Sequence, residues 1–177
     1  MSLHLSFLPW VVALGALVVC SAFFSSSESA IFSLPTEPTA EEFGDASTAS
    51  SASAATLADL RADPHRLLVT LLVGNNLVNV AISSIVMLLV ARYFDPGAAV
   101  AVATAVAATL VLVFGEIVPK SYGLGHAATW SLRVARPIAA VELALSPLVF
   151  VFDAVTRRLT TVVGGDADIE ETYTEDG

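Results

Sequence analysis

Long apolar runs separated by shorter polar stretches dominate the pattern of the chain. One run covers residues 5–34, a second covers residues 67–91 and a third covers residues 98–120. Because an α-helix rises about 1.5 Å per residue, about 20 apolar residues are enough to cross the hydrocarbon core of a bilayer. The pattern therefore predicts an all-α membrane protein with three transmembrane helices.

Helix-start signals stand before two of these runs. Asp63-Pro64 precedes the second run and Asp95-Pro96 precedes the third. Asp caps a helix N-terminus and Pro suits the first helical turn. Pro35 ends the first run, and a cleaved signal peptide is disfavoured there because no Lys or Arg precedes the run.

A further apolar stretch, residues 137–159, is also long enough to cross a bilayer, but Glu142, Pro147 and Asp153 interrupt it. Three crossings with the N-terminus outside would leave seven basic residues inside and only Arg92 outside. A fourth crossing would move the arginine pair at 157–158 to the outside. We therefore expect juxtamembrane helices over residues 126–163 that lie at the inner interface, and a cytoplasmic C-terminus.

Composition supports a membrane domain over residues 1–163 and adds two acidic appendages. Charged residues make up only 14% of the chain and hydrophobic residues 55%, whereas soluble domains carry about 25% charge. The net charge of −9 argues against a nucleic-acid partner. We expect residues 36–62 to form a mobile, acidic cytoplasmic linker and residues 164–177 an acidic, disordered tail.

Polar residues inside the first run form a face of their own. Polar groups in hydrocarbon are costly, so they mark either a functional site or adhesion between helices. Ser21, Ser25 and Glu28 have the spacing i, i+4, i+7 and share one helix face. Ser27 lies off that face, where it can bond to its own helix. A solvated Glu28 near the inner end is the plain alternative.

The second run repeats this pattern with amides. Asn75, Asn79 and Ser83 recur every four residues, with Asn76 beside them. Amide groups at membrane depth need partners in the protein or in a cavity. Gly74 allows a close approach of another backbone or of an ion.

The third run ends in a carboxylate next to a helix-breaking residue. Glu116 precedes Lys120 by four residues, which favours an ion pair within the helix. Pro119 has no N–H group, so the carbonyl of Gly115 loses its helical donor. Carboxylate, carbonyl, hydroxyl and amide oxygens are ligands for a hard cation such as Mg²⁺ or Na⁺. The plain alternative is a kinked helix with a neutral Glu–Lys pair.

Four motifs, taken in order, resemble a known family. They are SSSESA at residues 25–30, DPHRLL at residues 63–68, GNNLVN at residues 74–79 and GEIVPK at residues 115–120. Together they resemble the transmembrane domain of the CNNM/CorC (cyclin M) magnesium transporters, and the resemblance covers residues 5–163.

The resemblance implies a homodimer of three-span protomers in the plasma membrane, with a juxtamembrane helical belt. It implies Mg²⁺ efflux coupled to Na⁺ influx through a cation site that opens to the cytoplasm. Its implied ligands are Ser21, Ser25, Asn75 or Asn76, and Glu116. It also implies that Pro119 breaks the helix, that Lys120 is a charge partner and that Gly123 lends backbone near the site.

The chain departs from the family in lacking the pair of cytoplasmic CBS domains that usually follows. We expect either a truncated chain or a membrane domain served by a separate CBS-domain protein. A non-transporting membrane scaffold or a magnesium sensor is the second functional class. An enzyme is not expected, because the runs carry no serine–base pair or aspartate dyad for an intramembrane hydrolase.

Overall fold

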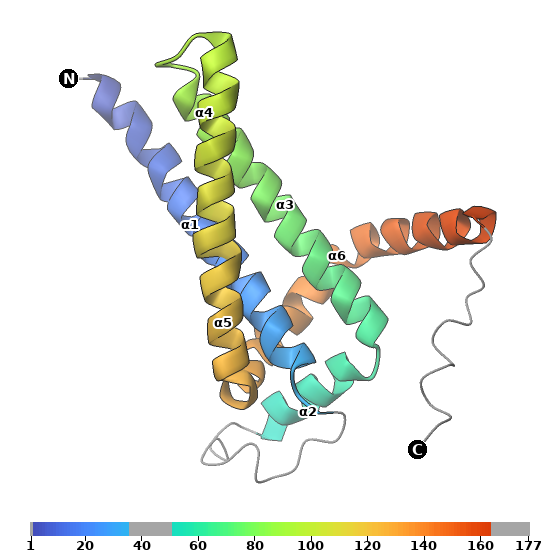
Figure 1. The fold of residues 1–177 in the computed structure, drawn as a ribbon. Coiled ribbons are helices and arrows are strands. Elements are labelled where there is room, and N and C mark those ends of the chain that lie inside the picture. Colours follow the sequence, from blue (N-terminus) through green and yellow to red (C-terminus); the bar gives the residue numbers. More distant parts are fainter. Residues whose placement is uncertain (1, 36–50, 164–177) are drawn as a thin grey trace.

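The computed structural model describes residues 2–35 and 51–163, and Figure 1 shows their arrangement. The acidic tail at 164–177 and residues 36–50 of the expected linker lie outside the described residues. Every element within the described ranges is helical. In chain order these are α1 (Ser2–Phe32), α2 (Ser51–Arg61), α3 (Pro64–Val90), α4 (Pro96–Thr109), η2 (Leu110–Ile117), α5 (Val118–Gly125) and α6 (Ala127–Val163).

Three of the described helical stretches are long and apolar enough to cross a membrane: Phe7–Phe32, Pro64–Val90 and Pro96–Gly125. The third consists of α4, η2 and α5, which form one continuous rod in Figure 1. Large apolar side chains such as Leu77, Val100 and Leu112 are exposed on these helices, as a lipid-facing surface requires. The all-α, three-span prediction is therefore confirmed.

The two helix-start signals act as the sequence predicts. The Asp63 carboxylate accepts a hydrogen bond of 3.0 Å from the backbone N–H of Arg66, at the start of α3. The Asp95 carboxylate accepts bonds of 3.2 Å from the backbone N–H groups of Gly97 and Ala98, at the start of α4. These caps satisfy backbone donors that have no partner inside a helix.

The third span corrects the expected helix break at Pro119. Instead of breaking, the helix widens into the π-helical segment η2 and continues as α5, with Pro119 in the first turn of α5. The N–H group of Val118 donates to the carbonyl of Val113, five residues earlier rather than four. The wide turn thus ends just before the residue that lacks a donor, so the proline is accommodated without ending the span.

The linker prediction is wrong for residues 51–61, which form α2. This helix packs against α6 and buries Leu57 and Leu60, which are 3% and 7% exposed. The two leucines are three residues apart and so lie on one helix face. Burial of this small apolar face offsets the entropy cost that argued for a mobile segment.

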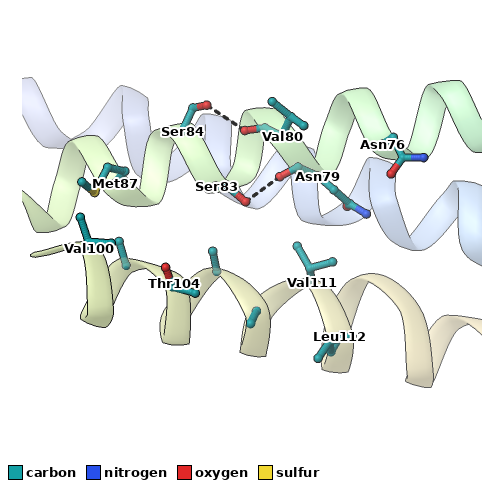
Figure 2. A pocket seen from close by; sticks show the side chains of 13 residues that line it. Asn76, Asn79, Val80, Ser83, Ser84, Met87, Val100, Thr104, Val111 and Leu112 are labelled. Atoms are coloured by element: carbon teal, nitrogen blue, oxygen red, sulfur yellow. Dashed lines mark hydrogen bonds between the residues drawn. The ribbon is translucent and has the colours of Figure 1, made fainter.

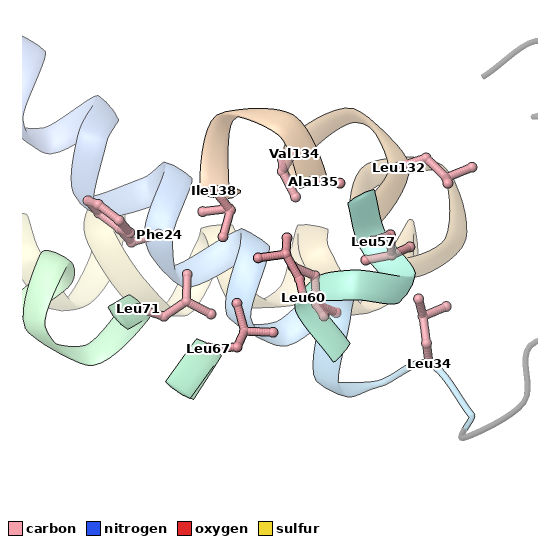
Figure 3. Close-up of a cluster of buried hydrophobic side chains, with 11 residues drawn as sticks. Phe24, Leu34, Leu57, Leu60, Leu67, Leu71, Leu132, Val134, Ala135 and Ile138 are labelled. Atoms are coloured by element: carbon pink, nitrogen blue, oxygen red, sulfur yellow. The ribbon is translucent and has the colours of Figure 1, made fainter. Parts of the chain in front are cut away.

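A hydrophobic core at one end of the spans joins them to α2 and α6 (Figure 3). Leu67 and Leu71 of α3 meet Val134 and Ile138 of α6 there, with Leu34 beyond the end of α1. α6 is a single helix despite its two internal prolines, and its second half projects away from the spans (Figure 1). It is not among the described helices that could cross a membrane.

Candidate functional site

Polar side chains from all three spans meet near the middle of α1. The hydroxyl of Ser21, which is fully buried, lies 2.8 Å from Oδ1 of Asn79 and 3.2 Å from Oδ1 of Asn75. Nδ2 of Asn79 donates to Oε1 of Glu116 at 3.4 Å. The structure thus brings together α1, α3 and η2 through these four residues, which we call the polar cluster.

Two amide oxygens of the polar cluster turn toward a single hydroxyl proton. Ser21 carries one hydroxyl proton, which two amide oxygens share. Amide and carboxylate oxygens only accept hydrogen bonds, and each has two lone pairs. The unused lone pairs of Ser21, Asn75, Asn79 and Glu116 therefore favour a positively charged occupant. Oxygen ligands of these kinds suit a hard cation.

Ser25 lies one helical turn from Ser21 along α1. Its side chain is fully buried, and Oγ has no hydrogen-bond partner among the described residues. Leaving a buried hydroxyl unpaired costs about 1–3 kcal/mol. A bound ion or its water would satisfy this oxygen.

Glycines allow the helices to approach at the polar cluster. A Cβ atom on Gly115 would lie 2.6 Å from Oγ of Ser21, so α1 and η2 touch at this point. A Cβ atom on Gly74 would lie 2.6 Å from the ring of Phe24, which is therefore the neighbour that Gly74 admits. Gly123 contacts the backbone carbonyl of Ser26, next to Ser25.

Asn76 does not join the polar cluster. Its side chain is exposed, and Nδ2 donates to the carbonyl of Leu72 in its own helix at 2.9 Å. Figure 2 shows Asn76 in a groove between α3 and α4 that also holds Ser83 and Thr104. The groove has a volume of about 920 Å³, and Asn79 lies between it and the polar cluster. Of the two candidate asparagines, only Asn75 lies beside Ser21.

Lys120 pairs with Glu28 rather than with Glu116. Its Nζ atom lies 3.3 Å from Oε2 of Glu28, and this ion pair joins α5 to α1. The predicted pair within the third span is therefore wrong. Side chains four residues apart lie next to each other in an α-helix. Glu116 lies in the wider π-helical segment, so this spacing does not hold there, and its carboxylate contacts Asn79 instead.

The remaining serines of α1 have structural contacts. Ser27 donates to the carbonyl of Phe23 at 2.6 Å, as its position off the polar face predicts. Sequence reasoning missed Ser26, whose hydroxyl accepts a bond of 3.1 Å from Nε1 of Trp130 in α6. The signal was the indole N–H itself, which needs an acceptor when the ring is packed in a protein.

The polar cluster has the chemistry of an ion site with few charges. The described residues contain no group of three or more His, Cys, Asp or Glu side chains that could hold a metal. Glu116 is the single carboxylate, and the other oxygens are neutral. Such a site can replace part of the hydration shell of a cation without binding it too tightly to leave.

Comparisons with known proteins agree with this architecture. The model of the cyclin M transmembrane N-terminal domain matches residues 12–177. The UPF0053 inner membrane protein YfjD of Escherichia coli is 34% identical over 84% of this chain and 34% of its own length. A UPF0053 protein of Haemophilus influenzae is 31% identical over 88% of this chain and 36% of its own length. The chain thus spans about a third of the length of these relatives.

Proposed function

This chain belongs to the family of cyclin M transmembrane N-terminal domains, and we propose that it carries Mg²⁺ across the membrane through the polar cluster. The convergence of Ser21, Asn75, Asn79 and Glu116 from three spans is the observation that carries the proposal. Oxygen-only ligands and a single carboxylate suit a hydrated divalent cation that must be released again.

Each group of the proposed site has its own role in binding the ion. Glu116 supplies the negative charge, and the oxygens of Ser21, Asn75 and Asn79 replace part of the water around the ion. The buried hydroxyl of Ser25, which has no hydrogen-bond partner among the described residues, gains one. No covalent step is involved, and the direction that we propose is efflux driven by Na⁺ influx. Na⁺ is also a hard cation, so it would compete for the same oxygens.

A homodimer in the plasma membrane is part of the same proposal. In a single chain, the groove between α3 and α4 exposes Asn76, Ser84 and Thr104 at membrane depth. Polar and small side chains on a transmembrane surface favour contact with another helix over contact with lipid. A second copy of the chain would cover this groove, and a separate CBS-domain protein is the further partner that we propose.

Two amide substitutions and one carboxylate substitution test the proposal in proteoliposomes that contain a fluorescent Mg²⁺ indicator. Glu116→Gln keeps the size of the side chain but removes the charge, so we expect at least about a tenfold loss of Mg²⁺ flux. Asn79→Ala removes a cluster oxygen and should also reduce flux. Asn76→Ala is the matched control, because this amide lies outside the polar cluster, and it should leave flux nearly unchanged.

The same experiment separates transport from the alternative roles. Flux that survives Glu116→Gln unchanged would contradict the transport role of the polar cluster. If the unmodified protein binds Mg²⁺ but moves none, a magnesium sensor or a membrane scaffold becomes the better description.

A further inference from the structure

The polar face of α1 continues past the polar cluster to a carboxylate. Glu28 follows Ser25 by three residues and Ser21 by seven, so all three lie on one face of the helix. Glu28 is therefore about 10 Å from Ser21 along the helix axis, toward the end of the spans where α2 and α6 lie. The Glu28 side chain is 24% exposed, whereas Ser21 and Ser25 are fully buried.

The neighbour of Glu28 is a flexible cation on the facing helix. Nζ of Lys120 lies 3.3 Å from its carboxylate, and the Lys120 side chain is 42% exposed. Lys120 follows Glu116 in the third span, as Glu28 follows Ser21 in the first. The ion pair therefore joins the first and third spans, two of the three that form the polar cluster, one to two turns closer to the end where α2 and α6 lie.

The unpartnered hydroxyl of Ser25 lies between the ion pair and the polar cluster. Among the described residues it is buried without a hydrogen-bond partner, whereas the next two residues, Ser26 and Ser27, have partners. From the α6 end of α1 toward the middle of the helix, the oxygen groups are the Glu28 carboxylate, the Ser25 hydroxyl and the Ser21 hydroxyl of the polar cluster. A cation that enters at the α6 end and moves toward the middle of the membrane would meet these oxygens in that order.

We propose that Glu28 is a second cation-binding position, at the mouth of the path, and that Lys120 occupies it as a tethered cation when no metal ion is there. This inference rests on the proposed function. An incoming divalent cation competes with the single charge of the ammonium group, which swings away on its flexible stem. Lys120 thereby neutralises Glu28 in the absence of metal and sets the concentration of cation needed to displace it.

Two single substitutions distinguish this role from that of a structural ion pair. Isothermal titration of the detergent-purified full chain with MgCl₂ gives the apparent Kd of each variant. Because a part-exposed ion pair contributes up to about 1 kcal/mol, we expect Glu28→Gln to weaken the apparent affinity for Mg²⁺ about two- to fivefold and Lys120→Met to strengthen it by a similar factor. Both changes break the ion pair, so a merely structural pair would shift the affinity in the same direction in both variants.

An ion pair between α3 and α6 provides matched controls. Nε of Arg66 lies 2.7 Å from Oε1 of Glu142 and ties α3 to α6 away from the polar face of α1. Arg66→Met and Glu142→Gln should therefore leave the Kd for Mg²⁺ unchanged. Affinity shifts of equal sign in Glu28→Gln and Lys120→Met, or no shift in either, would overturn the inference. The proposed function fails separately, if the unmodified protein gives no heat with MgCl₂ and transports none.

Discussion

Glycine residues set the distance between the first and third spans. Gly115 lies against the hydroxyl of Ser21, and Gly123 lies against the backbone carbonyl of Ser26, two helical turns farther along. Any side chain at these positions would have to push α1 away. The oxygens of the polar cluster can be shared between the helices only because the helices approach this closely.

Gly123→Ala tests this close contact. The added methyl group meets backbone rather than a flexible side chain, so the helices must separate, and overpacking of this kind costs about 1–3 kcal/mol. We expect a lower thermal unfolding temperature in detergent and weaker Mg²⁺ binding. Gly125→Ala is the control in the same helix, because a Cβ atom there meets nothing within 4 Å. Because alanine is the better helix former, helix propensity alone would raise the stability of both variants, and an equal effect in both would show that the contact with Ser26 is not responsible.

The sequence predicts which faces of the spans are polar, but not every pairing between them. The spacing of Ser21 and Ser25, and that of Asn75 and Asn79, placed each set on one face, and the structure brings Ser21, Asn75 and Asn79 together. The choice between Asn75 and Asn76 depends on how α3 is rotated toward α1. Packing against other helices sets this rotation, and a single sequence does not contain it.

At the scale of elements, long apolar runs and helix caps are readable from sequence, and shorter features are not. α3 and α4 begin where Asp63 and Asp95 predict. α2 was missed because its serine- and alanine-rich composition is typical of a linker. Its two buried leucines form an apolar face, but the sequence alone does not show that α6 packs against that face. The π-helical segment leaves no pattern in the sequence, since one extra residue per turn changes only the alignment after it.

The π-helical segment η2 gives a testable prediction. Deleting Leu112, which is exposed, would remove the extra residue and restore α-helical bonding while α4 and α5 keep their faces. Glu116 would then turn away from Asn79, so we expect Mg²⁺ flux to be lost while helical content, measured by circular dichroism, is retained. Deleting Ala105 in α4 is the control. It rotates one half of the span by about 100° and should prevent folding. Normal flux in the Leu112 deletion would show that η2 does not position Glu116.

At the scale of the whole molecule, α2 and α6 tie the three spans together at one end. Arg66 joins α3 to α6 through Glu142, and Trp130 joins α6 to α1 through Ser26. Arg61 of α2 donates to the carbonyls of Leu34 and Pro35, just past the end of α1. At the opposite end, the guanidinium of Arg92 lies over the ring of Phe7. The Glu28–Lys120 pair lies between the polar cluster and this tied end.

The orientation of this tied end in the membrane is the last prediction. Seven of the eight basic residues lie at this end or in α6, and basic residues favour the cytoplasmic side. Cysteines introduced into a chain whose only native cysteine is replaced, as Cys20→Ala, can be labelled in intact cells with a membrane-impermeant maleimide. We expect labelling of Phe94→Cys, in the exposed turn between α3 and α4, and none of Ala62→Cys until the cells are opened. Arg158→Cys in α6 should behave like Ala62→Cys, because we expect α6 to lie at the membrane interface rather than cross. Labelling of Arg158→Cys from outside would mean a fourth crossing and would place two arginines on the unfavourable side.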